Sequence, residues 1–256
     1  MIMKKVSVPG LMLAALLGLS SVPAHAEDTS VGGDIGVYNQ YVWRGLTQTS
    51  GKAAVQGDIA VGYGGLSASA WFSNAYASPA PQFAGRDVVE FDWGLDYSGA
   101  FGDLGYSVGG FYYTYLYDSA SNFPEAYVGL SYDALISPSA TVYVNLAGST
   151  NFTYLAGDAW IDAALGASLA GLDLSAGVSF AVWATDAVNR VTTDNFKDGI
   201  QVVTVGLSKD VPMGDVMLTA SLTGTIPVVS DSVDGQKRIY GTVAENEVVF
   251  GLNLAY

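Results

Sequence analysis

The chain has 256 residues and a formal net charge of −14, and half of its residues are hydrophobic although only 13% are charged. This acidity argues against nucleic acid as a partner, because phosphate backbones bind basic surfaces. There is no cysteine, so disulfides, thiol nucleophiles and thiolate metal sites are excluded.

The first 26 residues have the pattern of a secretory signal peptide. Lys4 and Lys5 precede an apolar stretch at 6–19, and Ala24-His25-Ala26 is a small-x-small cleavage site. We predict a signal peptide over residues 1–26, cleaved after Ala26. The alternative of a retained anchor is disfavoured, because the stretch is too short to span a bilayer comfortably.

Cleavage changes the chemistry that the chain can offer. It removes two of the 10 basic residues and the single histidine and keeps all 24 acidic residues, so the mature charge is 8 minus 24, or −16. A chain without histidine and cysteine cannot build Ser-His-Asp or Cys-His catalytic sites, nor zinc sites on those ligands. We expect no cofactor and no metal.

Beyond residue 26 the dominant pattern is period-two alternation in segments of about ten residues, as in membrane-spanning strands. No apolar run there reaches 18 residues, so no transmembrane helix is predicted. In the clearest segment Phe91 and Trp93 alternate with Glu90 and Asp92. The predicted strands are 33–45, 53–63, 66–74, 87–97, 104–116, 125–133, 140–147, 158–169, 172–183, 199–208, 216–226 and 247–256.

The connections between these segments alternate between short turns and long loops. Outer-membrane barrels have short turns on one side, long loops on the other, an even strand number and both termini at the short turns. The sequence therefore predicts an all-β, closed antiparallel transmembrane barrel of about 12 strands over residues 27–256. A soluble all-β domain is the alternative. It is disfavoured because the polar face carries Ser, Gly, Thr and Asp rather than Lys and Glu.

Two further patterns point to the outer membrane of a Gram-negative bacterium. Tyr63, Tyr97, Tyr132 and Tyr256 fall beside short turns, where barrels carry an aromatic girdle. The chain ends "VVFGLNLAY", which resembles the C-terminal signature that the barrel-insertion machinery reads. We expect that machinery, outer-membrane lipids and lipopolysaccharide as partners.

The stretch "YVWRGLTQT", residues 41–49, places a fixed cation in an apolar strand. If Tyr41 and Trp43 face lipid, Arg44 faces the lumen, which avoids a cost of roughly 2–4 kcal/mol for a cation at mid-bilayer. We expect Arg44 to join an interior ion-pair network that holds an inward loop or lines a constriction. The remaining pore-lining candidates are the inward acidic residues Asp58, Glu90, Asp92, Asp96 and Glu125.

Residues 38–74, "YNQYVWRGLTQTSGKAAVQGDIAVGYGGLSASAWFSN", resemble the N-terminal signature of the TorF family of bacterial outer-membrane porins. The chain departs from that signature at Asn39, Ala68 and Ala70. The resemblance implies an outer-membrane barrel with a pore role, and it brings no substrate and no catalytic residues. The matching positions are Tyr41, Arg44, Gly45, Thr47, Gln48, Thr49, Gln56, Gly57, Trp71, Ser73 and Asn74.

The leading functional hypothesis is a non-enzymatic porin-like channel of the outer membrane for passive diffusion of small polar solutes or ions. Because inward acidic residues outnumber basic ones, we expect cation preference. Three alternatives stay open: a non-conducting structural or surface-interaction barrel that uses the long loop at 227–246, an all-carboxylate enzyme using Glu90 and Asp92, and a plugged bore. The inward aromatic residues that would plug it are Tyr113, Tyr115, Tyr127, Tyr143 and Trp183.

Overall fold

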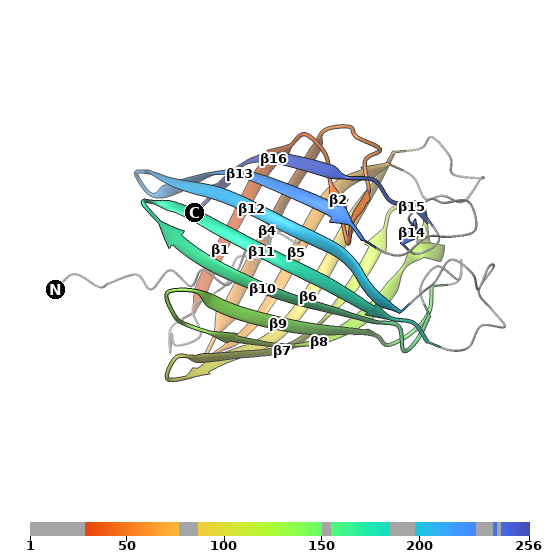
Figure 1. Ribbon diagram of the computed structural model, residues 1–256, viewed down its shortest axis with the longest axis horizontal. Coiled ribbons are helices and arrows are strands. Elements are labelled where there is room, and N and C mark those ends of the chain that lie inside the picture. The colour runs from red at the N-terminus through yellow and green to blue at the C-terminus, as the bar shows by residue number, and fades with distance from the viewer. Residues whose placement is uncertain (1–28, 77–86, 150–154, 185–197, 229–237, 240–241) are drawn as a thin grey trace.

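The computed structural model describes residues 29–76, 87–149, 155–184, 198–228, 238–239 and 242–256 (Figure 1). The predicted signal peptide at 1–26 lies outside these residues, as do parts of four long connections. No helix within the described ranges is long and apolar enough to cross a membrane.

Twelve antiparallel strands form one closed barrel, as predicted. The ring closes because β1 pairs with β4 on one side and with β16 on the other. The chain enters β1 and leaves β16 at the end that carries the short turns (Figure 1). The strands are β1 (Ser30–Tyr38), β4 (Ala54–Tyr63), β5 (Leu66–Tyr76), β6 (Asp87–Phe101), β7 (Leu104–Tyr115), β8 (Phe123–Tyr132), β9 (Ser137–Asn145), β10 (Ala159–Leu169), β11 (Leu172–Val182), β12 (Gly199–Met213), β13 (Val216–Pro227) and β16 (Glu247–Ala255).

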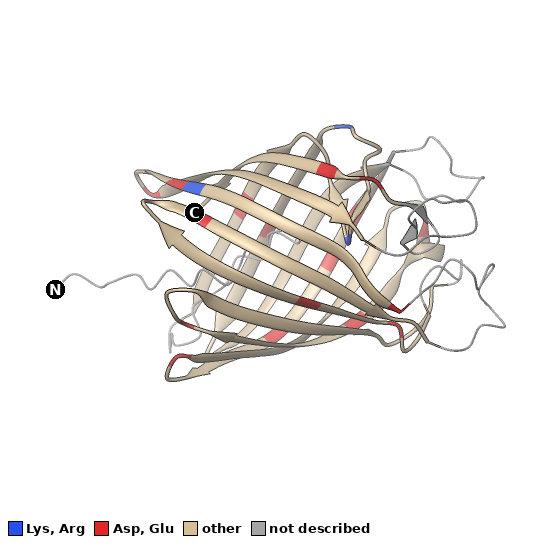
Figure 2. Ribbon diagram, in the orientation of Figure 1, with Lys and Arg blue, Asp and Glu red and all other residues tan. Residues whose placement is uncertain are grey.

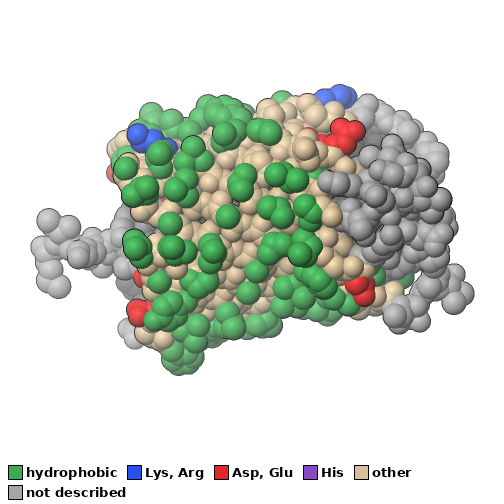
Figure 3. Space-filling model, in the orientation of Figure 1, with side chains coloured by type: hydrophobic (Ala, Val, Ile, Leu, Met, Phe, Trp, Pro, Cys, Tyr) green, Lys and Arg blue, Asp and Glu red, His purple; other side chains and the backbone are tan. Residues whose placement is uncertain are grey.

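The outer face of the barrel is apolar. The outward side chains Val31, Ile35 and Val37 of β1 are more than half exposed, and a similar alternation runs through the other strands. Hydrophobic side chains cover the wall in Figure 3, and the charged groups visible there lie toward its two ends. A continuous apolar belt of this kind has no stable place in water, whereas it matches the hydrocarbon layer of a bilayer. The four predicted girdle tyrosines are all exposed, from 45% to 70%.

The inner face changes character along the barrel axis. On β11 the inward side chains nearest the short turn, Asp173 and Ser175, are partly exposed, while Ser179 and Ala181 toward the other end are buried. Strand β13 repeats this gradient from Thr219 to the buried Thr225. Within the described residues the lumen is therefore accessible from the short-turn end and filled in its other half.

Much of the filling comes from a segment that we predicted as the end of the first strand and the long connection after it. That strand ends at Tyr38 instead of continuing to residue 45, and the chain turns into the lumen as a hairpin of β2 (Val42–Trp43) and β3 (Leu46–Thr47). Tyr41 and Trp43 are 2% and 6% exposed, so the prediction that they face lipid was wrong. The physical reason is that the bore offers these rings a complete apolar contact surface on the inner wall.

Three short elements complete the described structure. The 3-10 helix η3 (Ser119–Ser121) lies between β7 and β8, and β14 (Arg238–Ile239) pairs with β15 (Thr242–Val243) before β16.

Candidate functional site

The centre of the site is the inward hairpin, which we define as residues 39–53. Val42 pairs with Thr47 and Trp43 with Leu46, so Arg44 and Gly45 form a two-residue turn. Their φ angles of 48° and 82° are those of a type I′ turn, which favours Asn-Gly. Left-handed backbone costs a non-glycine residue about 1–2 kcal/mol, so Arg44 is unfavourable for the turn itself. The reason for an arginine at this position must therefore lie in the contacts that its side chain makes.

Two asparagines hold the base of the inward hairpin. The Asn39 amide donates to the carbonyl of Val248 at 3.0 Å and accepts from the N–H of Phe250 at 2.7 Å, which extends the pairing of β1 with β16. On the other side, Asn74 donates to the Ala53 carbonyl at 3.1 Å and accepts from the Val55 N–H at 2.7 Å. These side chains replace backbone partners where the hairpin leaves the sheet.

The flanks of the inward hairpin pack against aromatic side chains of the wall. Tyr41 meets Trp71 edge to face with ring centroids 5.4 Å apart, and Trp43 contacts Tyr113 and Phe123 at 6.0 and 6.3 Å. Trp71, Tyr113 and Phe123 are at most 1% exposed. Aromatic pairs of this geometry contribute about 0.5–1.5 kcal/mol each beyond the area that they bury. The packing makes the hairpin an ordered constriction.

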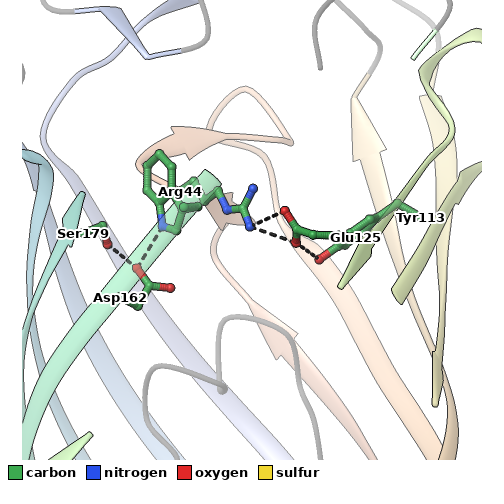
Figure 4. Close-up of polar contacts among 6 residues, drawn as sticks. Arg44, Tyr113, Glu125, Asp162 and Ser179 are labelled. Atoms are coloured by element: carbon green, nitrogen blue, oxygen red, sulfur yellow. Dashed lines mark hydrogen bonds and ion pairs between the residues drawn. The ribbon is translucent and has the colours of Figure 1, made fainter. Parts of the chain in front are cut away.

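Arg44 reaches from the tip of the inward hairpin to the opposite wall (Figure 4). Its Nη2 lies 2.8 and 2.9 Å from the two carboxylate oxygens of Glu125, and the two side chains are 7% and 1% exposed. The rings of Trp43, Trp160 and Tyr143 surround the guanidinium, with centroids 4.4, 5.1 and 5.4 Å from Cζ. A desolvated cation gains about 2 kcal/mol from such a contact.

Glu125 is held from both sides. Besides the ion pair with Arg44, it accepts a hydrogen bond from the Tyr113 hydroxyl at 3.0 Å (Figure 4). A buried carboxylate is stable only when it is paired and hydrogen-bonded, and these contacts meet both conditions. The prediction that Arg44 joins an interior ion pair and fixes an inward segment is thus supported by the geometry, although Arg44 sits on a turn and not on a strand.

A second carboxylate lies next to the aromatic rings that surround Arg44. Asp162 on β10 accepts hydrogen bonds from Trp160 Nε1 at 2.8 Å and from the Ser179 hydroxyl at 2.5 Å. Asp162 and Arg44 both line a cavity of about 30 Å³, together with Thr204 and Thr225. This volume accommodates one or two waters. The interior beside the guanidinium is therefore closely packed.

The other acidic candidates line the wall on the β4–β6 side. Asp58, Glu90 and Asp92 are 8%, 3% and 4% exposed, and Asp96, nearer the short turns, is partly exposed and bonded to Ser67. Acidic side chains are distributed along the barrel strands in Figure 2, where lysines and arginines are few. These residues give the lumen its negative sign, but they do not gather around Arg44 as Glu125 does.

Among these carboxylates, Asp92 is the one whose burial is expected to lower the free energy of unfolding the most. Both of its oxygens are buried without a hydrogen-bond partner among the described residues, and Glu90 lies on the same face two residues earlier. We expect Asp92→Asn to raise the free energy of unfolding by about 1–3 kcal/mol, because it removes an unpaired buried charge. The measurement is urea unfolding in lipid vesicles followed by tryptophan fluorescence. The control Asp96→Asn, at a partly exposed position, should change little, and a destabilised Asp92→Asn would contradict the expectation.

The positions that carry the TorF resemblance gather on and around the inward hairpin. Gln56 donates to Ser73 at 3.4 Å beside the buried Tyr41–Trp71 contact, and Thr49 accepts from the N–H of Tyr41 at 3.0 Å. At Gly57 a Cβ would lie 2.7 Å from the carbonyl of Asp34, so a side chain does not fit there. In this chain, the matching positions therefore form the inward hairpin and the part of the wall against which it packs.

The sequence analysis did not single out two of the residues that surround Arg44. Trp160 and Asp162 had only the period-two signal of β10, which places them on the inner face without naming a partner. The hairpin had a stronger signal, since an X-Gly pair at Arg44-Gly45 between alternating residues is typical of two-residue turns. No group of three or more metal-ligating side chains suited to an ion occurs in the described part of the chain.

Comparisons with known proteins show the architecture. No family model matches the chain, and no curated protein matches it in sequence. The NanC porin structure matches with a TM-score of 0.51 and 10% identity over 89% of this chain and 99% of that one. An outer membrane phospholipase from Salmonella typhi, a dimer with bound calcium, gives 0.46 and 12% over 97% and 98%. The outer membrane channel DcaP of Acinetobacter baumannii gives 0.40 and 10% over 90% and 96%. At 10% identity the likeness to NanC shows the barrel fold alone.

Proposed function

We propose that the protein is a porin-like channel of the Gram-negative outer membrane, narrowed by the inward hairpin and selective for small cations. By this proposal it is one of the TorF-type porins, whose N-terminal signature its residues 38–74 resemble. The single observation that carries the proposal is the constriction itself. Inside a closed barrel with a polar inner face, the inward hairpin packs against the wall and leaves a cavity of about 30 Å³ beside the buried ion pair Arg44–Glu125. A barrel that served only as a wall would need no such constriction.

Cation selectivity follows from the fixed charges of the lumen. Asp96 and Asp162 lie on the inner wall beside hydrogen-bond donors, and Arg44 is neutralised by Glu125. In a narrow, low-dielectric passage even a small excess of one sign raises the concentration of counter-ions.

The experiment is a reversal-potential measurement in a planar bilayer under a KCl gradient. We expect a small conductance with a reversal potential displaced toward the Nernst potential of K⁺. The variant Asp96→Asn/Asp162→Asn should move it toward zero, since it removes fixed negative charge from the path. A reversal potential on the Cl⁻ side would overturn the selectivity, and a folded barrel without any conductance would overturn the channel.

One observation favours a second function, a non-conducting structural barrel. Trp71, Trp160, Tyr113 and Phe123 are among the most deeply buried side chains, and all four lie within the bore around the hairpin. If this packing never opens, the protein serves as a wall element whose long loops contact lipopolysaccharide or other surface molecules. The bilayer measurement separates the two functions. An all-carboxylate enzyme is disfavoured, because Glu90 and Asp92 are 3% and 4% exposed and Glu90 is already bonded to the Tyr115 hydroxyl.

A further inference from the structure

The cage that holds Arg44 is built mostly from the barrel wall and not from the hairpin. Glu125 comes from β8, Tyr143 from β9, and Trp160 and Asp162 from β10; we call these four residues the cation cage. Tyr143 and Trp160 are direct cross-strand partners in the sheet. Because the strands fix all four side chains, the cation cage would keep its shape if the tip of the hairpin moved away.

The charges of the cation cage are not balanced by Arg44 alone. It contains two carboxylates, and Arg44 makes its ion pair with Glu125, while Asp162 is satisfied by neutral donors. The adjoining cavity of about 30 Å³ is lined by Arg44 and Asp162 and also by Thr225. Thr225 is 1% exposed, and its hydroxyl has no hydrogen-bond partner among the described residues. The cation cage thus offers two carboxylates and two aromatic rings to a positively charged ligand.

We propose that the cation cage is a binding site for guanidinium-bearing solutes, and that Arg44 is its built-in occupant. This inference rests on the proposed channel for access to the site. A flat, weakly hydrated guanidinium matches the site better than a compact ammonium ion, because it can lie against the Trp160 and Tyr143 rings while its edge donates to Glu125. A solute with this group competes with Arg44 and releases the tip of the inward hairpin.

Competition has a measurable consequence. The apparent affinity of the native protein is reduced by the fraction of molecules in which Arg44 has left the cage. Arg44→Asn removes the occupant and keeps the turn, since Asn adopts the left-handed backbone readily. We expect methylguanidinium to bind this variant about tenfold or more tightly than the native protein.

The probe is methylguanidinium chloride, titrated into the purified barrel in detergent micelles. The readouts are tryptophan fluorescence and the midpoint of thermal unfolding. Specific binding raises the midpoint in a saturable way, whereas nonspecific denaturation by a guanidinium salt lowers it. Methylammonium chloride at the same ionic strength is the control ligand. The variant Arg44→Asn/Glu125→Gln is the control protein and should show no saturable rise.

The expected result is saturable stabilisation of Arg44→Asn by methylguanidinium, a weaker one of the native protein, and none with methylammonium. Absence of saturable binding by folded Arg44→Asn would overturn the inference, as would equal binding by the double variant. The native titration alone decides the matter if the variants do not fold. Since binding in micelles needs no pore, a barrel that binds but does not conduct contradicts the channel alone, and one that conducts without binding contradicts the cation cage alone.

Discussion

Replacing residues 39–53 with Asn-Gly is expected to raise the single-channel conductance roughly tenfold, because a twelve-stranded barrel without its insert is wider than the eight-stranded barrels that side chains just fill. Tyr38 and Ala54 are cross-strand partners, so a two-residue type I′ turn can join β1 directly to β4. The strands themselves stay paired with their neighbours in the ring. The measurement is conductance in a planar bilayer, with circular dichroism to verify the strand content.

The double variant Arg44→Asn/Glu125→Gln is the matched control for this experiment. It keeps the backbone of the inward hairpin and its contact with Trp71, and it removes the ion pair together with the cation–aromatic contacts of Arg44. We expect its conductance to lie between those of the native and shortened proteins. A shortened barrel that folds but conducts no better than the native one would show that the barrier lies elsewhere in the lumen.

Glu125→Gln alone is expected to lower the free energy of unfolding by about 3–5 kcal/mol, since it leaves the Arg44 guanidinium buried without its anion. Arg44→Asn should lower the free energy of unfolding by a similar amount, because it leaves Glu125 without its ion-pair partner. Glu125 is 1% exposed and would keep only the hydrogen bond from the Tyr113 hydroxyl. Urea unfolding in lipid vesicles, followed by tryptophan fluorescence, measures both changes.

The double variant again provides the test of mechanism. With both charges gone, neither partner is left unpaired, so its cost should be well below the sum of the two single costs. The remaining loss reflects the cation–aromatic contacts with Trp43 and Trp160. Additive costs would mean that the two side chains stabilise the barrel independently and that the ion pair does not hold the hairpin.

The strand pattern was predictable because it depends on a local property. In a strand the side chains alternate between two faces, so a wall with lipid outside and a polar lumen inside must alternate apolar and polar residues. Segments such as 87–97 and 216–226 therefore appear in the structure as β6 and β13 with ends shifted by a few residues. The same alternation placed Asp58, Glu90 and Glu125 on the inner face, where they lie.

The inward hairpin was not predictable from alternation, because Tyr41 and Trp43 would suit lipid as well as they suit the interior of the bore. Their aromatic partners, Trp71 and Tyr113, are distant in sequence and meet them only when the barrel closes. The strain at Arg44 is likewise visible only in the backbone, where φ is 48°. Periodicity alone determined that the chain forms a twelve-stranded barrel with an acidic interior. Only the closed ring decided that residues 39–53 fold into the lumen, because contacts across a lumen join residues that no local pattern connects.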